Sequence, residues 1–140
     1  MFLGTMQRIP NAPDTCLGEA LLWFRKNMLT RAAGMRPNTP KKIIVMTDGK
    51  SLPDFPGVNF YPILGYKNCP MGIAESANPI KRMRNTEVYA IGVGQQCRVD
   101  SRGNRIGGGC YMKSELEEIA SRGSKKYIYE VSTFEELVNR

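Results

Sequence analysis

The sequence predicts an α/β fold: a partial, doubly wound (Rossmann-like) parallel sheet of about three strands flanked by about four helices. Two observations lead to it. Apolar stretches at residues 43–46, 88–93 and 127–131 each have the length of a strand. Segments with helical spacing of apolar residues separate them, and this alternation is typical of parallel sheets with right-handed crossovers. A chain of 140 residues is long enough for one domain with a real core.

The first predicted helix covers residues 16–29. Its apolar positions recur at helical spacing, and Thr15 stands just before it, where a hydroxyl commonly caps free N–H groups. Pro37 and Pro40 prevent its continuation. The apolar positions are Leu17, Ala20, Leu21, Phe24 and Met28.

The first predicted strand, residues 43–46, is apolar at every position and ends abruptly in Thr47-Asp48-Gly49. Such a run indicates a strand covered on both faces. The Asp-Gly pair then makes a turn that leaves the Asp48 carboxylate at the carboxyl edge of the sheet, where open α/β sheets bind ligands.

The second predicted helix runs from Pro79, a good first helical residue, to Arg84, with Ile80 and Met83 buried. Residues 87–94 form the second predicted strand.

Two capping boxes predict the last helices. Ser114 and Glu117 open a helix that ends at Gly123, and Thr133 and Glu136 open the final one. The third predicted strand, residues 126–131, lies between them. The predicted buried positions are Leu116, Ile119 and Ala120 in the first helix, and Phe134, Leu137 and Val138 in the second.

Two long loops, residues 52–71 and 95–111, interrupt the pattern. Loops of this length are often functional. The first is rich in proline and aromatic residues. The second carries three arginines and Gly107-Gly108-Gly109, a composition that predicts mobility above a fixed base.

The four cysteines show no C-x-x-C spacing and the chain has no histidine, which disfavours a structural zinc site. Two disulfides fit better and would imply an oxidising compartment. Of three connectivities we favour Cys97–Cys110, because these residues bound one Gly-rich loop, and this leaves Cys16–Cys69. The start of the chain lacks the apolar core of a signal peptide, so we expect either a cytosolic chain with free thiols or a sequence whose true N-terminus is absent.

Several function classes are disfavoured. The basic residues behind the net charge of +7 are scattered, which argues against nucleic-acid binding, and the longest apolar run, residues 20–24, is too short to enter a membrane. Without histidine, Ser/His and Cys/His catalysis is excluded within this chain. Gly92-Val93-Gly94 begins a dinucleotide fingerprint, but Cys97 stands in place of the third glycine. We therefore expect no enzyme, and a nucleotide-binding domain remains an alternative.

Three parts of the chain resemble the von Willebrand factor type A domain family. Residues 14–21 are similar to its Thr motif, residues 42–51 to its fourth strand and Thr-Asp-Gly motif, and residues 88–94, 115–120 and 134–137 to its last strands and helices. The resemblance implies a truncated type A domain over residues 1–140, whose first three strands and two helices would precede Met1.

The resemblance also implies a metal-ion-dependent adhesion site. In the family, Mg2+ is held by an Asp-x-Ser-x-Ser motif, a threonine and the aspartate of Thr-Asp-Gly, and an acidic group of the partner completes the shell. Thr15 and Asp48 match the second and third contributions, but this chain has no Asp-x-Ser-x-Ser. We therefore expect an incomplete site with weak or no Mg2+ binding by this chain alone.

The implied function is a non-enzymatic protein-binding or adhesion domain of a secreted or extracellular matrix, cell-surface or complement-like protein. An intracellular type A scaffold in the cytoplasm is an alternative. In the family the first strand lies beside the fourth, and here that first strand would precede Met1. We therefore also expect residues 42–47 to form an exposed sheet edge that favours self-association. Partner contacts are predicted in the two loops at Lys50, Ser51, Phe55, Tyr61, Tyr66, Arg98, Arg102 and Arg105.

Overall fold

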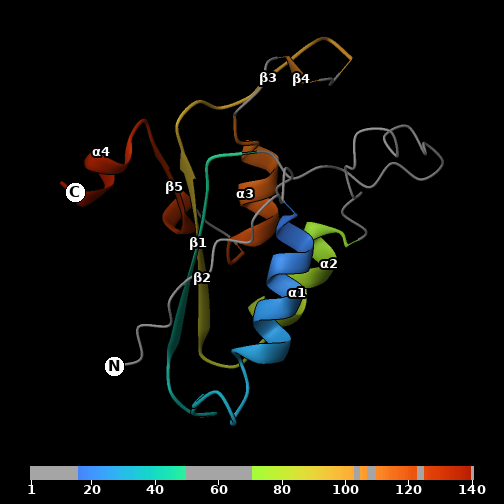
Figure 1. The fold of residues 1–140 in the computed structure, drawn as a ribbon, viewed down its shortest axis with the longest axis vertical. Coiled ribbons are helices and arrows are strands. Elements are labelled where there is room, and N and C mark those ends of the chain that lie inside the picture. Colours follow the sequence, from blue (N-terminus) through green and yellow to red (C-terminus); the bar gives the residue numbers. More distant parts are fainter. Residues whose placement is uncertain (1–15, 50–70, 103–104, 107–109, 123–124, 140) are drawn as a thin grey trace, which may run out of the picture.

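The computed structural model describes residues 16–49, 71–102, 105–106, 110–122 and 125–139, and it confirms the predicted α/β fold (Figure 1). Its centre is a three-stranded parallel sheet with the order β1-β2-β5. In register, Ile44 of β1 pairs with Tyr89 of β2, and Ile91 of β2 pairs with Tyr129 of β5. The strands are β1 (Lys41–Thr47), β2 (Thr86–Val93) and β5 (Ile128–Val131).

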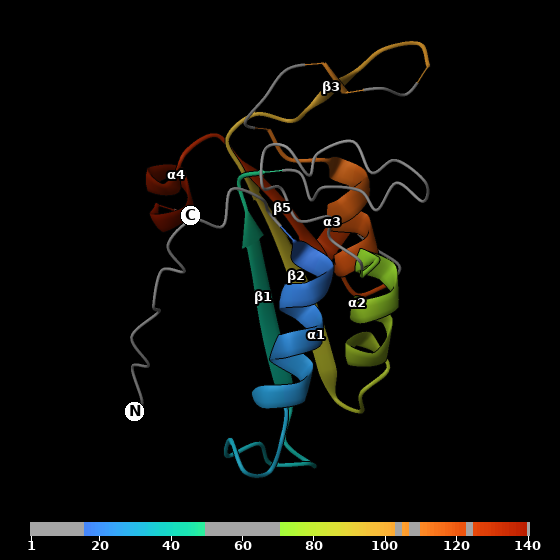
Figure 2. The same cartoon turned by 45° about the vertical axis from the view of Figure 1, so that its right-hand side comes forward.

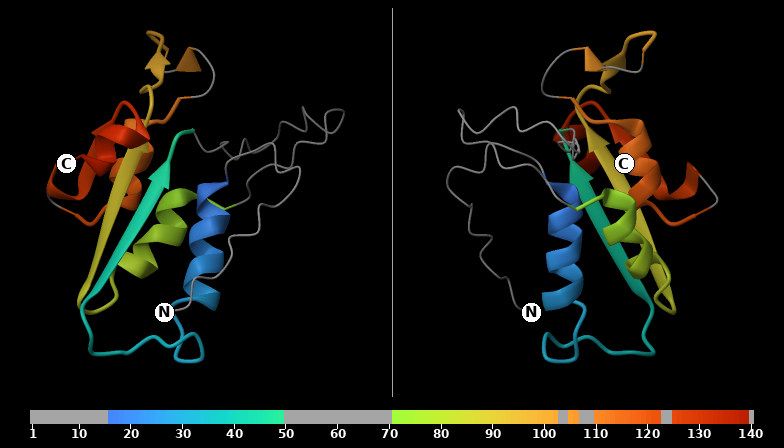
Figure 3. Two further views of the ribbon diagram at one scale, coloured as in Figure 1. Left: turned by 60° about the vertical axis from the view of Figure 1, so that its left-hand side comes forward. Right: turned by 90° about the vertical axis from the view of Figure 1, so that its right-hand side faces the viewer.

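One face of the sheet carries the main hydrophobic core. Three helices cover it, and two of them, α1 and α2, lie side by side (Figures 2 and 3). Ile43, Val88 and Ala90 supply the sheet side of this core, and Leu116 and Ile119 of α3 are fully buried against it. The covering helices are α1 (Leu17–Asn27), α2 (Ile73–Lys81) and α3 (Lys113–Ile119).

The opposite face of the sheet is only partly covered. Among the described residues one helix, α4 (Phe134–Val138), packs there, and its Leu137 contacts a small cluster of strand residues. Away from α4, Ile44 and Met46 keep 63% and 42% of their surface exposed. The prediction that β1 is covered on both faces is therefore wrong for the described chain, because no described helix lies over its outer half. The cluster comprises Ile91, Val93 and Val131.

The predicted sheet edge is confirmed within the described part of the chain. β1 is the outermost strand of the order and pairs with β2 alone. Self-association through this edge stays a prediction.

The second helix begins earlier than predicted. α2 starts at Ile73, and Pro79 lies inside it rather than at its start. Ile73, Ala77 and Ile80 are all buried, so packing against the sheet extends the helix in front of the proline. Ile80 is buried as predicted, whereas Met83 is half-buried and follows the helix.

Thr133 caps α4 as predicted, but the return bond of the predicted capping box goes to Ser132 and not to Thr133 itself. Thr133 Oγ1 accepts a hydrogen bond from Glu136 N–H at 3.2 Å, and Glu136 Oε2 accepts one from Ser132 N–H at 2.8 Å. Ser114 does not cap α3, because the helix begins at Lys113 and Met112 takes the N-cap position without a side-chain bond.

Three further features of the helices and strands differ from the predictions. α3 ends at Ile119, where Ala120 turns extended, instead of continuing to Gly123. In the short α4 only Leu137 packs inward, while Phe134 and Val138 are 54% and 84% exposed. The third strand begins at Ile128, after a 3-10 turn at Lys125–Tyr127.

The described part of the loop at residues 95–111 contains a two-stranded antiparallel hairpin, which the sequence did not predict. Its strands are β3 (Arg98–Val99) and β4 (Arg105–Ile106). The prediction for the loop at 52–71 falls almost entirely outside the described residues. The predicted site residues that lie outside are Thr15, Lys50, Ser51, Phe55, Tyr61, Tyr66 and Cys69.

Candidate functional site

The carboxyl ends of the three parallel strands meet at one edge of the sheet, and β1 ends there in the turn Thr47-Asp48-Gly49. Thr47 is buried, and its hydroxyl donates to the Gly49 carbonyl at 2.8 Å and accepts from the Gly49 N–H at 3.3 Å. These bonds hold the turn, and Asp48 between them is exposed. Sequence reasoning missed the role of Thr47, although a hydroxyl that bonds two residues ahead is a known turn former.

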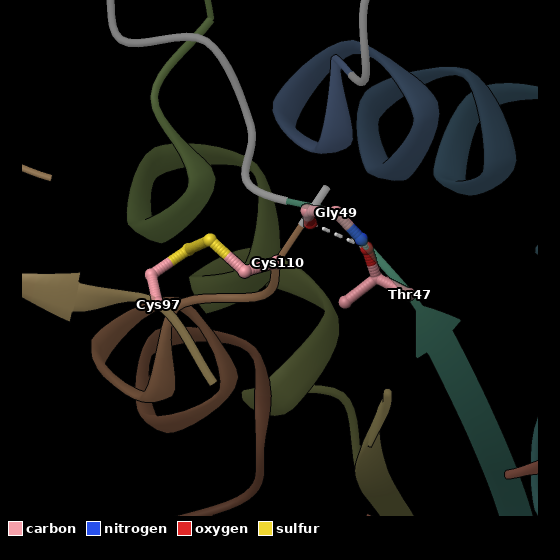
Figure 4. The surroundings of a disulfide bond; sticks show 4 residues. All are labelled: Thr47, Gly49, Cys97 and Cys110. Atoms are coloured by element: carbon pink, nitrogen blue, oxygen red, sulfur yellow. Dashed lines mark hydrogen bonds between the residues drawn. A yellow bond between two sulfur atoms is a disulfide. The ribbon is translucent and has the colours of Figure 1, made fainter. Parts of the chain in front are cut away.

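A disulfide closes the base of the hairpin at the same edge. Cys97 and Cys110 are bonded, with their Cα atoms 4.9 Å apart, as the spacing of the loop predicted. Cys97 N–H donates to the Tyr111 carbonyl at 2.8 Å, and Tyr111 N–H donates to the Gln95 carbonyl at 3.1 Å. Figure 4 shows the Thr47 turn in the surroundings of this disulfide. The segment that leaves β2 and the segment that leads into α3 are thus fixed together.

The hairpin lies beyond the end of the sheet and carries basic residues (Figure 1). Arg98 and Arg102 are exposed, and the Arg102 N–H donates to Asp100 Oδ1 at 2.9 Å. The backbone of Arg105 pairs with Val99, but its side chain lies outside the described set. The structure therefore brings two of the three predicted arginines to the edge that carries Asp48.

A second acidic residue at this edge, Glu130 of β5, is neutralised by its neighbours. Its Oε1 forms an ion pair with Lys113 Nζ at 2.9 Å, and its Oε2 accepts from the Tyr111 hydroxyl at 2.9 Å. The Lys113 bond and then the Tyr111 bond hold the pKa of Glu130 below its ordinary value, although burial opposes them. Burial and the Glu130 carboxylate raise the pKa of Tyr111 to about 12. Glu130 therefore has a structural role in tying α3 and the hairpin base to β5.

The two glycines of Gly92-Val93-Gly94 also have structural roles. A Cβ on Gly92 would lie 2.7 Å from the Tyr111 ring and 2.9 Å from Leu116 Cδ1. Gly94 has a φ of +94°, which a side chain would strain, and its N–H donates to the Val131 carbonyl at 2.9 Å. The space next to Gly92 is occupied by Tyr111 and Leu116, and Gly94 turns the chain out of the sheet. Packing and chain direction therefore account for both glycines of Gly92-Val93-Gly94, without a phosphate-binding role.

The first turn of α1 is fixed to the segment in front of α2. Glu19 Oε1 accepts from the Met71 N–H at 2.7 Å, and Gly18 lies against the Met71 carbonyl so closely that a Cβ would not fit. Cys16 is disulfide-bonded, and its predicted partner Cys69 lies outside the described residues. None of the described cysteines is free.

The described residues do not by themselves complete a metal site. Asp48 offers one carboxylate, and nowhere in the described ranges do three or more His, Cys, Asp or Glu side chains gather. A six-coordinate Mg2+ needs more oxygen ligands than this, even if it keeps several waters. No described helix is long and apolar enough to span a bilayer.

Comparison with known proteins agrees with this arrangement. The model of the von Willebrand factor type A domain family matches residues 5–140. The fold is similar to two solved structures of proximal thread matrix protein 1 (PTMP1) from the mussel byssus, each 23% identical over 89% of this chain. The first, crystal form 2, gives a TM-score of 0.55. The second, described as having a zinc-occupied MIDAS motif, gives 0.57.

The chain spans only 22% of the length of either mussel protein, so the likeness concerns the fold. The family match covers nearly the whole chain. It agrees with the three-stranded parallel sheet, with the helices that flank it and with the Thr-Asp-Gly turn at its carboxyl edge. The protein therefore belongs to the von Willebrand factor type A domain family, whose members are protein-interaction and adhesion domains.

Proposed function

We propose that this chain is a non-enzymatic protein-binding domain of an extracellular matrix, cell-surface or complement-like protein. The observation that carries the proposal is the meeting of two features at one edge: the exposed Asp48 carboxylate and the disulfide-closed hairpin with Arg98 and Arg102. The neighbouring residues are buried and have structural roles. The side chains of Asp48, Arg98 and Arg102 are exposed and are not needed for the core, which favours a role in binding.

Asp48 supplies a hard oxygen ligand of the kind Mg2+ prefers. In a complete type A domain an Asp-x-Ser-x-Ser segment and the threonine that Thr15 matches would share the ion, and an acidic group of the partner would complete the shell. The residues of this chain make only part of that arrangement. Metal-dependent binding is therefore proposed for the complete domain, and weak metal binding for this chain.

The hairpin supports the choice of partner. Arg98 and Arg102 stand on a base fixed by the Cys97–Cys110 bond, so little order has to be gained when they bind. Guanidinium groups pair with carboxylates through two parallel hydrogen bonds. We therefore expect the partner surface to be acidic, which also suits a site that takes a carboxylate onto a metal.

The disulfide supports an extracellular location. Disulfides persist in oxidising compartments and are rare in the cytosol. A cytoplasmic scaffold would require the bond between Cys97 and Cys110 to be reduced in the cell.

The test is a binding measurement by surface plasmon resonance. Purified protein, both as this chain and as a type A domain completed with an Asp-x-Ser-x-Ser segment ahead of it, is passed over a panel of immobilised extracellular matrix proteins, in millimolar Mg2+ and again in EDTA. The proposal expects saturable binding to at least one matrix protein, with lower affinity in EDTA. Absence of binding to every panel member would contradict the proposal, and undiminished binding in EDTA would remove the metal from it.

A further inference from the structure

The segments that lead from each helix into the next strand of the sheet are rich in basic residues. They are residues 25–42, 81–86 and 121–127. All three contain lysines and arginines, and none contains an aspartate or a glutamate. Because the strands are parallel, each segment enters the sheet at the same, amino end. Bases that are scattered along the sequence are therefore gathered at one end of the fold.

Hydrogen bonds hold these segments next to one another. The Lys41 N–H, at the start of β1, donates to the Asn85 carbonyl, just before β2, at 2.7 Å. Ser121, which follows α3, is joined to Val88 of β2 by two bonds: its N–H donates to the Val88 carbonyl at 2.9 Å, and its Oγ accepts from the Val88 N–H at 2.8 Å. α1 and α2 lie side by side, and both end at the lower end of the molecule in Figure 2. The three segments thus form one surface.

We call the side chains of Lys26, Lys81, Arg82, Arg84 and Arg122 the basic end. Lys81 is half-buried and the other four are exposed. The ion pairs within the described ranges involve none of them. A cation near a helix C-terminus stabilises the helix dipole, but only within the last turn. Arg84 and Arg122 lie beyond the ends of α2 and α3, so this structural explanation does not cover them.

Lys81 shows how closely these charges lie. Its Nζ donates to the Glu118 carbonyl in the last turn of α3. Burial and then the repulsion from Arg122 lower the pKa of Lys81, although Glu118 opposes them. The α2 and α3 parts of the basic end therefore repel each other, and a bound anion would relieve this repulsion.

We propose that the basic end binds a sulfated glycosaminoglycan chain. Sulfate and carboxylate groups repeat along such a chain, which suits cations that are spread over several segments better than one small anion would. Guanidinium groups bind carboxylates and similar oxyanions through two parallel hydrogen bonds, and Arg82, Arg84 and Arg122 are all exposed for this.

The basic end lies apart from both edges of the sheet discussed above. Asp48 and the hairpin are at the carboxyl ends of the strands, opposite to it. Arg82, Arg84 and Arg122 stand where α2 and α3 lead into β2 and β5, and not at β1. The glycosaminoglycan site is therefore a second site, and neither Asp48 nor a metal takes part in it.

The compartment decides which polyanion is expected. The Cys97–Cys110 bond favours an oxidising, extracellular setting, where the polyanionic chains are polysaccharides. Nucleic acids belong to the cell interior, and the negative membrane surface is that of the cytoplasmic leaflet. This choice of ligand rests on the extracellular location in the proposed function, but not on the metal or the protein partner.

The first test measures binding of the full chain to immobilised heparin by surface plasmon resonance, in EDTA and at several NaCl concentrations. We expect saturable binding that weakens steeply with salt, because bound cations displace counterions from a polyanion. Arg82→Ala/Arg84→Ala should bind about tenfold more weakly at about 0.15 M salt, with a salt slope smaller by about two. The variant should fold, because Arg82 and Arg84 form their hydrogen bonds through backbone atoms.

Arg98→Ala/Arg102→Ala is the matched control. It removes two exposed arginines from the hairpin at the other end of the sheet and lowers the net charge by the same amount. Its loss should stay below about threefold, because salt screens charges that far from the ligand. Equal losses would mean that heparin is attracted by net charge alone, and a larger loss in the control would move the site to the hairpin. Either result would overturn the proposal, as would the absence of saturable binding by the natural chain.

The second test compares polyanions by competition with the immobilised heparin. Soluble heparin fragments, a single-stranded DNA oligonucleotide and phosphatidylserine vesicles are added at equal total charge, and the heparin fragments should compete best. Stronger competition by the DNA or by the vesicles would overturn the choice of a glycosaminoglycan. Because all these measurements are made in EDTA, failure of heparin binding and failure of the Mg2+-dependent partner binding are separate results.

Discussion

The ring of Tyr111 occupies the space that a side chain at residue 92 would need. A Cβ built on Gly92 would lie 2.7 Å from Tyr111 Cδ2 and Cε2. Tyr111 directly follows Cys110, so this contact seats the base of the hairpin on the central strand of the sheet. The carboxyl edge thus depends on the absence of a side chain at Gly92.

Gly92→Ala is expected to destabilise the protein by about 1–3 kcal/mol, because the added methyl group overpacks a core in which neither Tyr111 nor Leu116 has room to move. Urea unfolding measures the change. Gly72→Ala is the matched control: its Cβ would lie 3.8 Å from the nearest atom, an ordinary contact. Equal stability of the two variants would contradict the packing role of Gly92.

Replacing both Cys97 and Cys110 by alanine is expected to lower the free energy of unfolding by about 2–4 kcal/mol, because the bond closes a loop with a sequence separation of 13. Urea unfolding of the variant and of the natural protein with its disulfides intact measures the difference in free energy. Hydrogen exchange at residues 95–102 should speed up in the variant. A loss below about 1 kcal/mol would mean that the Tyr111 contacts alone hold the hairpin base.

Acid is expected to weaken the tie between α3 and β5. The pKa of Glu130 is lowered from 4.5 in the folded protein, chiefly by Lys113, so the stability this group contributes is present above that value and is lost as the pH falls through the folded pKa. Glu130→Gln should therefore lose less stability than the natural protein between neutral pH and about pH 3. Urea unfolding at both pH values provides the comparison, with Glu118→Gln, which leaves the ion pair intact, as control. An equal acid loss in Glu130→Gln and the natural chain would contradict the assignment.

Mg2+ is expected to bind weakly and at Asp48. With one described carboxylate in place of a full ligand set, saturation should require about millimolar Mg2+. Amide shifts in an NMR titration report both the place and the affinity. The largest shifts should fall on Asp48 and Gly49 and vanish in Asp48→Ala. Tight binding, or shifts confined to other residues, would contradict this prediction.

The features that the sequence predicted correctly are mostly local ones. Thr133 and Glu136 are three residues apart and form their cap whatever the rest of the chain does, and the Thr-Asp-Gly turn needs only Thr47 and Gly49. A short stretch of chain specifies such features, and so the order of strands and helices could be read without a structure.

The features it missed depend on distant parts of the chain. Ile44 and Met46 have the composition of a buried strand, but burial also requires an element on the other side, which no local pattern reports. Pro79 is a good helix start, yet Ile73 and Ala77 find a core to pack on and extend α2 in front of it. The roles of Thr47 and Tyr111 likewise become visible only when the strands are side by side.

One comparison of affinities tests whether the carboxyl edge is the partner-binding surface. Asp48→Ala and Glu118→Ala each remove one exposed carboxylate, but Glu118 lies near the end of α3, where Ser121 N–H donates to Val88 close to the start of β2. The affinity for a matrix protein bound in Mg2+ is measured for both by surface plasmon resonance. If partners bind at the carboxyl edge, Asp48→Ala loses at least tenfold in affinity, about 1.4 kcal/mol, and Glu118→Ala does not change it. Unchanged affinity in Asp48→Ala, or an equal loss in both variants, would contradict it.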